Sequence, residues 1–167
     1  MAKVKNQLYR ATLGPLFPLI FLSCGPYSFN PGGSGAKSIA VPLFENQTTQ
    51  FGVREALTDS VSARFLRDNT LKITSTAGAE LLLAGAIVRY ERTAHAFDAN
   101  QQVKQYVVNV WAAVSVTNQK DRKIVWEEKE LLGFGIYDAN LETEEDGKAR
   151  AVSKLAENIV NRTLRGW

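Results

Sequence analysis

Residues 106–116 read YVVNVWAAVSV, and every second position in this stretch is apolar. Such strict alternation predicts a β-strand with one face in the core and the other toward solvent. Residues 80–97 and 124–131 also have the character of long strands, and residues 98–101 and 118–122 between them have the composition of tight turns. We therefore expect an antiparallel meander of three long strands, which needs a layer to cover its apolar face.

Two amphipathic helices can supply that layer. Apolar side chains recur every four positions in residues 53–68, at Val53, Leu57, Val61 and Phe65. A second helix is predicted near the C-terminus, where acids at 142–146 precede an apolar face and arginines follow it, as the helix dipole favours. That face comprises Val152, Leu155, Ala156, Ile159, Val160, Thr163 and Leu164. The prediction is an α+β fold, with two helices packed on one face of a four- or five-stranded, mostly antiparallel sheet.

The remaining elements are short. Residues 38–44 and 71–74 read as strands, and Pro42 favours an edge position or a bulge for the first of them. Asn69 follows the first predicted helix and is expected to end it in a left-handed turn. Residues 133–137, GFGIY, are interpreted as a strand end or a loop that carries aromatic side chains.

Residues 1–23 have the organisation of a bacterial lipoprotein signal peptide. A basic start is followed by an apolar run at 11–22, which is shorter than the roughly 20 residues of a membrane-spanning helix. Ser23 then precedes Cys24, the only cysteine of the chain. In this arrangement the thiol receives diacylglycerol, the chain is cleaved before the cysteine, and the new amine is acylated. We expect lipidation at Cys24; the alternatives are an uncleaved anchor, or an ordinary signal peptide beside an incidental cysteine.

The mature chain then divides into a tether and a domain. Residues 24–37 hold the lipidated cysteine and a segment rich in glycine and proline, which predicts a flexible tether with a reach of at most roughly 45 Å. Gly25, where an aspartate would favour retention at the inner membrane, favours the outer membrane. Residues 38–167 are expected to form a single domain, anchored by lipid on the periplasmic face.

Composition and motifs exclude several classes of function. The chain has a net charge of +3, but residues 1–23 alone hold three basic residues and no acidic one, so the remainder is neutral and lacks the charge of a duplex-binding domain. No phosphate-binding loop, zinc-ligand pair or nucleophile elbow is present. We expect a protein that is not an enzyme and uses no cofactor or metal. The acids at 142–146 read as a solvated helix start, with calcium binding as the alternative.

Three segments resemble the LptE family of lipopolysaccharide-assembly lipoproteins. CGPYSF at 24–29 is similar to that family's Cys-Gly-Tyr-x-Phe opening, with Pro26 as an extra residue. Residues 38–65, SIAVPLFENQTTQFGVREALTDSVSARF, resemble its first strand, its Pro-x-Phe-Glu-Asn-x-Thr turn and its first helix. Residues 79–92, AELLLAGAIVRYER, resemble its next strand, in which an acid precedes a Leu-x-Gly-x-Ile pattern.

This resemblance implies a partner, a ligand and a set of candidate residues. The implied partner is the LptD β-barrel, and the implied ligand is lipopolysaccharide. The places that are basic in family members hold Asp98 and the acids at 142–146 here, so we take the nearby cations as candidates for lipopolysaccharide contact: Arg89, Arg92 and Lys104. Candidate partner contacts are the exposed strand end and the aromatic segment, with core packing as the alternative: His95, Phe134, Ile136 and Tyr137. The rival function is a periplasmic lipoprotein that regulates a peptidoglycan synthase.

Overall fold

The structure is a computed structural model that describes residues 35–165, in which the chain forms six strands and two helices. The predicted signal peptide, Cys24 and most of the tether lie outside the described residues. The elements are β1 (Ser38–Ala40), β2 (Glu45–Asn46), α1 (Val53–Asp68), β3 (Lys72–Ile73), β4 (Leu81–Phe97), β5 (Val103–Asn118), β6 (Ile124–Asp138) and α2 (Glu144–Arg165).

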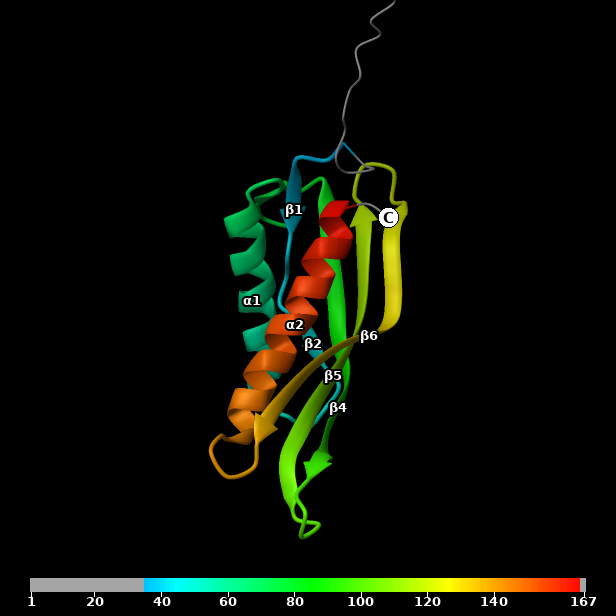
Figure 1. Cartoon of the computed structure of the whole chain (residues 1–167). Helices are drawn as coiled ribbons and strands as arrows, with labels where there is room; N and C mark the ends of the chain where they lie inside the picture. Colours follow the sequence, from blue (N-terminus) through cyan, green and yellow to red (C-terminus); the bar gives the residue numbers. More distant parts are fainter. Residues whose placement is uncertain (1–34, 166–167) are drawn as a thin grey trace, which may run out of the picture.

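One sheet contains every strand, in the order β3-β1-β4-β5-β6, with β2 paired to β4 beside β1 (Figure 1). The long strands β4, β5 and β6 pair antiparallel, as the alternating sequence predicts. The short strands pair in parallel, β1 with β3 and β4, and β2 with β4. Each of these pairs joins a strand before α1 to a strand after it, so α1 is the crossover that keeps the strands parallel. The predicted α+β class with a mostly antiparallel sheet is confirmed, and the two-residue strand β2 is an addition to it.

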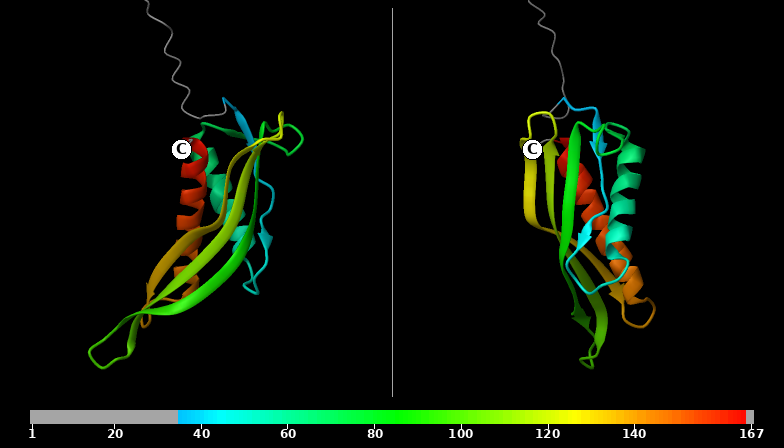
Figure 2. Two further views of the ribbon diagram at one scale, coloured as in Figure 1. Left: turned by 90° about the vertical axis from the view of Figure 1, so that its right-hand side faces the viewer. Right: turned by 180° about the vertical axis from the view of Figure 1, so that it is seen from behind.

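Both helices cover the same face of the sheet (Figure 2). The alternation in β5 places Val108, Val110 and Ala112 in the core without solvent exposure. Helix α2 packs over β5 and β6, and α1 lies beside α2 near β2 and β3. There α1 buries the four residues that recur along its sequence, Val53, Leu57, Val61 and Phe65. The burial of these complementary stripes is the main favourable contribution to folding.

Helix α1 is bounded at both ends by a residue in the left-handed backbone conformation. Asn69 adopts the left-handed conformation with φ of 60° and donates its N–H to the carbonyl of Phe65, which confirms the predicted turn. At the start, Gly52 has φ of 72° and supplies no side-chain cap. Glycine fits this position because a β-carbon disfavours a positive φ.

Of the two alternatives for residues 133–137, the strand end holds and the loop does not, because these residues form the last part of β6. Gly133 and Gly135 face α2, and a β-carbon on either would collide with the backbone of the helix at Ala151 or Gly147. These glycines therefore bring α2 into backbone contact with β6. The low strand propensity of glycine hides this part of the strand from sequence patterns.

The β4–β5 hairpin is longer than the helices and projects beyond them (Figure 2). β4 has 17 residues and spans about 56 Å, whereas the 22 residues of α2 span about 33 Å. The far part of the hairpin is consequently outside the core: every residue from Glu91 to His95 is exposed.

The glycine contact predicts a specific loss of stability. Replacing Gly135 by alanine should lower the free energy of unfolding by about 1–3 kcal/mol, because an added methyl group must displace α2. Gly78→Ala is the matched control, since its nearest neighbour would be Thr74 Oγ1 at 3.6 Å, and it should change stability by less than ~0.5 kcal/mol. Urea unfolding measures both; equal stability of Gly135→Ala and wild type would contradict the close packing.

Candidate functional site

Five side chains meet where the hairpin leaves the body, and we call them the hairpin-base cluster: Tyr90, Arg92, Tyr106, Tyr137 and Glu144. The Tyr90 hydroxyl donates to Glu144 Oε1 at 2.8 Å, and Arg92 Nη1 lies 3.7 Å from Glu144 Oε2. The Arg92 guanidinium also lies over the Tyr106 ring, 3.9 Å from its centroid. Tyr106 in turn stacks on Tyr137 with ring centroids 5.6 Å apart. The cluster joins all three long strands to the first turn of α2.

The chemistry of the cluster is that of binding and positioning. Burial, and then the hydrogen bond to the Glu144 carboxylate, raise the pKa of Tyr90 well above its ordinary value, so the phenol stays protonated and keeps donating. The side chain of Arg92 is 41% exposed, so its guanidinium can still reach an anion from solvent. A cation beside aromatic rings suits a ligand that combines phosphate with apolar groups.

Arg89 belongs to the other face of the sheet. It is opposite Trp111 of the neighbouring strand β5, and its guanidinium lies 3.8 Å from the centroid of that ring. The hairpin-base cluster, in contrast, faces the helices. The Arg89 guanidinium is also 3.8 Å from Glu91 and 3.9 Å from Glu130. The predicted set of Arg89, Arg92 and Lys104 is therefore divided between surfaces, as the odd spacing of the two arginines indicates.

His95 and Lys104 both occupy bulges near the tip of the hairpin. His95 is the extra residue of β4 between the pairs Ala94–Tyr106 and Ala96–Gln105, and Lys104 is the extra residue of β5 beside it. Both are exposed, and Lys104 makes no ion pair within residues 35–165. Bulges redirect side chains and are frequent beside functional sites, so the two residues stay candidates.

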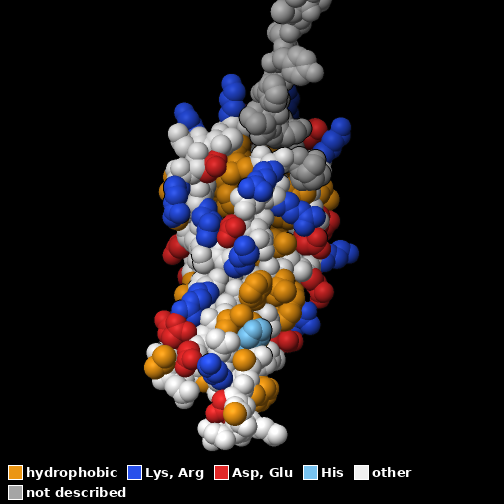
Figure 3. Space-filling model, in the orientation of Figure 1, with side chains coloured by type: hydrophobic (Ala, Val, Ile, Leu, Met, Phe, Trp, Pro, Cys, Tyr) orange, Lys and Arg blue, Asp and Glu red, His pale blue; other side chains and the backbone are white. Residues whose placement is uncertain are grey.

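Tyr137 is not exposed, and this part of the predicted partner surface needs correction. Its side chain is only 4% exposed because it packs over Gly147 and against Tyr106. The alternative interpretation, core packing, holds for Tyr137. Phe134 lies on the opposite side of β6 and is 48% exposed, and Ile136 is half-buried. Figure 3 shows hydrophobic side chains gathered over the lower part of the sheet, below a surface of mixed charges.

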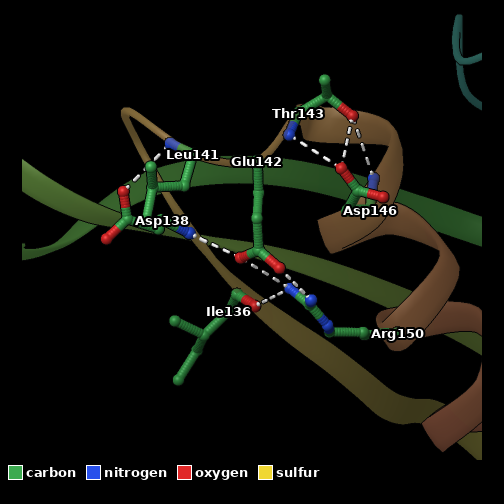
Figure 4. A network of polar contacts seen from close by, with 7 residues as sticks. All are labelled: Ile136, Asp138, Leu141, Glu142, Thr143, Asp146 and Arg150. Atoms are coloured by element: carbon green, nitrogen blue, oxygen red, sulfur yellow. Dashed lines mark hydrogen bonds and ion pairs between the residues drawn. The ribbon is translucent and has the colours of Figure 1, made fainter.

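A network of polar contacts holds the turn from β6 into α2, next to the helix position of Glu144 (Figure 4). Thr143 and Asp146 form a capping box: the Thr143 N–H and hydroxyl donate to Asp146 Oδ2 at 2.8 and 2.7 Å. Arg150 of α2 donates to the carbonyl of Ile136 at 2.7 Å and to both carboxylate oxygens of Glu142. The acids at 142–146 thus have structural partners, which the interpretation as a solvated helix start did not include.

The neighbouring acids Glu127 and Glu128 of β6 point to opposite faces of the sheet, since Glu128 pairs with Arg162 of α2 at 3.0 Å and Glu127 lies opposite Ser115. No group of three or more metal-ligating side chains occurs in the described range 35–165. None of the helices in that range has the length and hydropathy to cross a membrane.

The Glu142–Arg150 pair predicts a pH dependence of stability. Hydrogen bonds from Arg150 hold the pKa of Glu142 below its ordinary value of 4.5. The stabilisation is therefore present above pH 4.5 and disappears as the pH falls through the lowered pKa. Glu142→Gln should lower the urea midpoint at pH 7, and the gap to wild type should close toward pH 3.

Glu45→Gln is the control for this measurement, because it removes the same charge at a position without an ion pair in residues 35–165. The urea midpoint of Glu45→Gln should stay close to that of wild type from pH 7 to pH 3. A gap for Glu142→Gln that stays constant from pH 7 to pH 3 would show that the pair does not act through its charge.

Several solved structures share this fold. The chain is similar to protein XCC0632 from Xanthomonas campestris, with 12% identity over 78% of this chain and 85% of that chain and a TM-score of 0.58. It is similar to the hypothetical protein CT253 from Chlamydia trachomatis, with 12% identity over 76% of this chain and 95% of that chain and a TM-score of 0.54. It is also similar to dodecameric PelC from Paraburkholderia phytofirmans, with 14% identity over 81% of this chain and 92% of that chain and a TM-score of 0.52. Identities this low establish the fold alone. No curated protein sequence matches the chain.

A family match covers nearly all of the described domain. Residues 36–163 match the family described as LptE, Lipopolysaccharide-assembly. The match runs from just before β1 to the last turn of α2, so it includes both the meander and the hairpin-base cluster. The chain therefore belongs to the LptE family of lipopolysaccharide assembly.

Proposed function

We propose that this protein is an outer-membrane lipoprotein that partners the LptD β-barrel in the assembly and export of lipopolysaccharide. The observation that carries the proposal is the family match over residues 36–163. The family is non-catalytic, which supports a role in binding and assembly rather than in an enzymatic reaction. The cluster agrees with this role, because its groups stack and pair with one another and none is paired as a nucleophile and base.

Anchoring through Cys24 is part of this proposal and rests on the sequence. The domain begins close to the cysteine, since the Lys37 N–H already donates to Glu80 Oε2 at 2.9 Å. Twelve residues between the two allow a separation of about 40 Å at most. This short reach keeps the domain beside the periplasmic face of the membrane and disfavours a target in the cell wall.

The partner surface would include exposed apolar side chains around β6 and the hairpin. Phe134 borders a shallow hollow with Arg150 and Lys154 of α2, and Ile136 follows it on the same side of the strand. Phe97 at the hairpin tip is 60% exposed. Exposed aromatic side chains next to cations are frequent in protein interfaces, so we include Phe134, Ile136 and His95 as contacts.

Lipopolysaccharide contact is proposed for Arg92 and Lys104. Phosphate groups need cations, and acyl chains need apolar surface nearby. Arg92 lies over Tyr106, and Lys104 precedes that ring by two residues on the same strand. Glu144 competes for Arg92, so we expect modest affinity that falls with salt. Arg89 is on the other face and is left out of this set.

Purification of the complex tests the proposed function. The tagged mature chain, expressed in its own cells and purified from detergent-solubilised outer membrane, should carry LptD in a stable ratio. The expectation follows from family membership and from the short tether. A peptidoglycan synthase in place of LptD would favour the rival function, and recovery of the protein without a barrel would overturn the proposal.

Ligand binding is tested with two charge-matched variants. Arg92→Gln with Lys104→Gln should weaken lipopolysaccharide binding several-fold, because two cations are lost from the hairpin. Lys120→Gln with Arg122→Gln removes the same charge from the turn between β5 and β6, at the far end of the sheet, and should leave binding unchanged. Binding and thermal stability are measured for each. Equal losses from both pairs would show attraction by net charge and no site on the hairpin.

A further inference from the structure

The outer half of β4 has a neighbouring strand on one side only. Beside its first half, β1 pairs with Leu81 and Leu82, and β2 pairs with Ala86 and Ile87. Past Ile87, β4 pairs with β5 and with no other strand of the described chain (Figure 2, right). A row of backbone N–H and C=O groups is thereby open along this edge.

This open edge contains an uninterrupted stretch that is long enough to pair with another strand. Bulges at Val88 and His95 interrupt the pairing with β5, and between them Arg89 to Ala94 pair without a shift. Six residues span about 20 Å, which is the usual length of a strand. The bulges limit the regular edge to this segment.

The other long edge of the sheet is already occupied. β6 pairs only with β5, and two of its carbonyls accept hydrogen bonds from side chains of α2. Asn158 donates to Leu132 at 3.0 Å, and Arg150 donates to Ile136 at 2.7 Å. A strand could not add there without breaking these bonds, so the two edges differ in their capacity to pair.

The charged residues of the β4 edge are drawn away from it. Charged side chains usually protect an edge by lying along it. Here the guanidinium of Arg89 lies over Trp111, and that of Arg92 lies over Tyr106, at 3.8 and 3.9 Å. Both rings belong to β5, on the side of β4 that is already paired. The two arginines therefore leave the open side accessible.

We propose that the edge from Arg89 to Ala94 accepts an extended segment of the LptD partner by strand addition; this inference rests on the proposed function. Only an extended polypeptide presents backbone donors and acceptors at the repeat of this edge, which excludes a lipid headgroup. Along one face the edge offers Glu91 and Thr93, while the Arg89 guanidinium stays over β5. The added segment would carry a cation at the position that faces Glu91.

Hydrogen exchange in the purified LptD complex tests this pairing. Amides in residues 89–94 should exchange about tenfold more slowly in the complex than in the free protein, because half of them gain a partner. Residues 61–65 of α1, which are paired within the helix and outside every proposed contact, are the internal control, and their exchange should not change. A complex with unchanged exchange at 89–94 overturns the inference and leaves the proposed function intact, whereas the absence of a complex overturns the proposed function itself.

Variants distinguish an open edge from general burial. Trp111→Leu should release Arg89 toward the edge and lower retention of LptD several-fold, and adding Arg89→Ala should restore it, because a short side chain cannot obstruct the edge. Thermal stability is measured for each variant. If Trp111→Leu lowers LptD retention and the added Arg89→Ala does not restore it, the role of Arg89 at the edge is overturned. Protection of 89–94 in the protein alone that increases with its concentration would identify a second copy as the occupant and overturn a partner strand.

Discussion

The backbone contact between α2 and β6 is the constraint on which the other features depend. Gly133 and Gly135 admit the helix, and Gly147 admits the ring of Tyr137 from the strand. A side chain at any of these positions would move α2 away from the sheet. The first turn of the helix would then withdraw from the hairpin, and Glu144 would lose its contacts with β4. The packing of three glycines therefore sets the geometry of a site to which they contribute no side chain.

The projecting hairpin follows from the different rise of strands and helices. A residue in a strand advances the chain about 3.3 Å, and a residue in a helix about 1.5 Å. Helices of 16 and 22 residues cannot cover strands of 15 to 17 residues along their full length. The uncovered part keeps its pairing through β5, and the cluster at its base ties it to α2. A long, exposed element with strand pairing along its length results, which is suited to contact with other molecules.

Local patterns predicted most of this fold and little of the site. The alternation in residues 106–116, the stripe in 53–68 and the turn at Asn69 depend on near neighbours, so the sequence contains the whole signal. Glu144 meets Tyr90 across 54 positions, and no local period indicates such a contact. Tyr137 looked exposed because its burial depends on Gly147, in another element. The two-residue spacing of Tyr90 and Arg92 was the available signal that they share a face.

The hairpin also separates two kinds of contact. Arg92 and Lys104 offer charge to a ligand, and the edge of β4 offers backbone groups to a strand. In the proposed ligand site Arg92 already pairs with Glu144, so occupancy of that site should respond to salt and to neighbouring charge. The edge uses hydrogen bonds of fixed geometry, which respond to the conformation of the partner. Because both lie on one hairpin held by the same cluster, movement of Glu144 would affect both. The proposed function, in which the protein holds a barrel and passes on a lipid, would be served by a stable contact on the backbone and a reversible one on side chains.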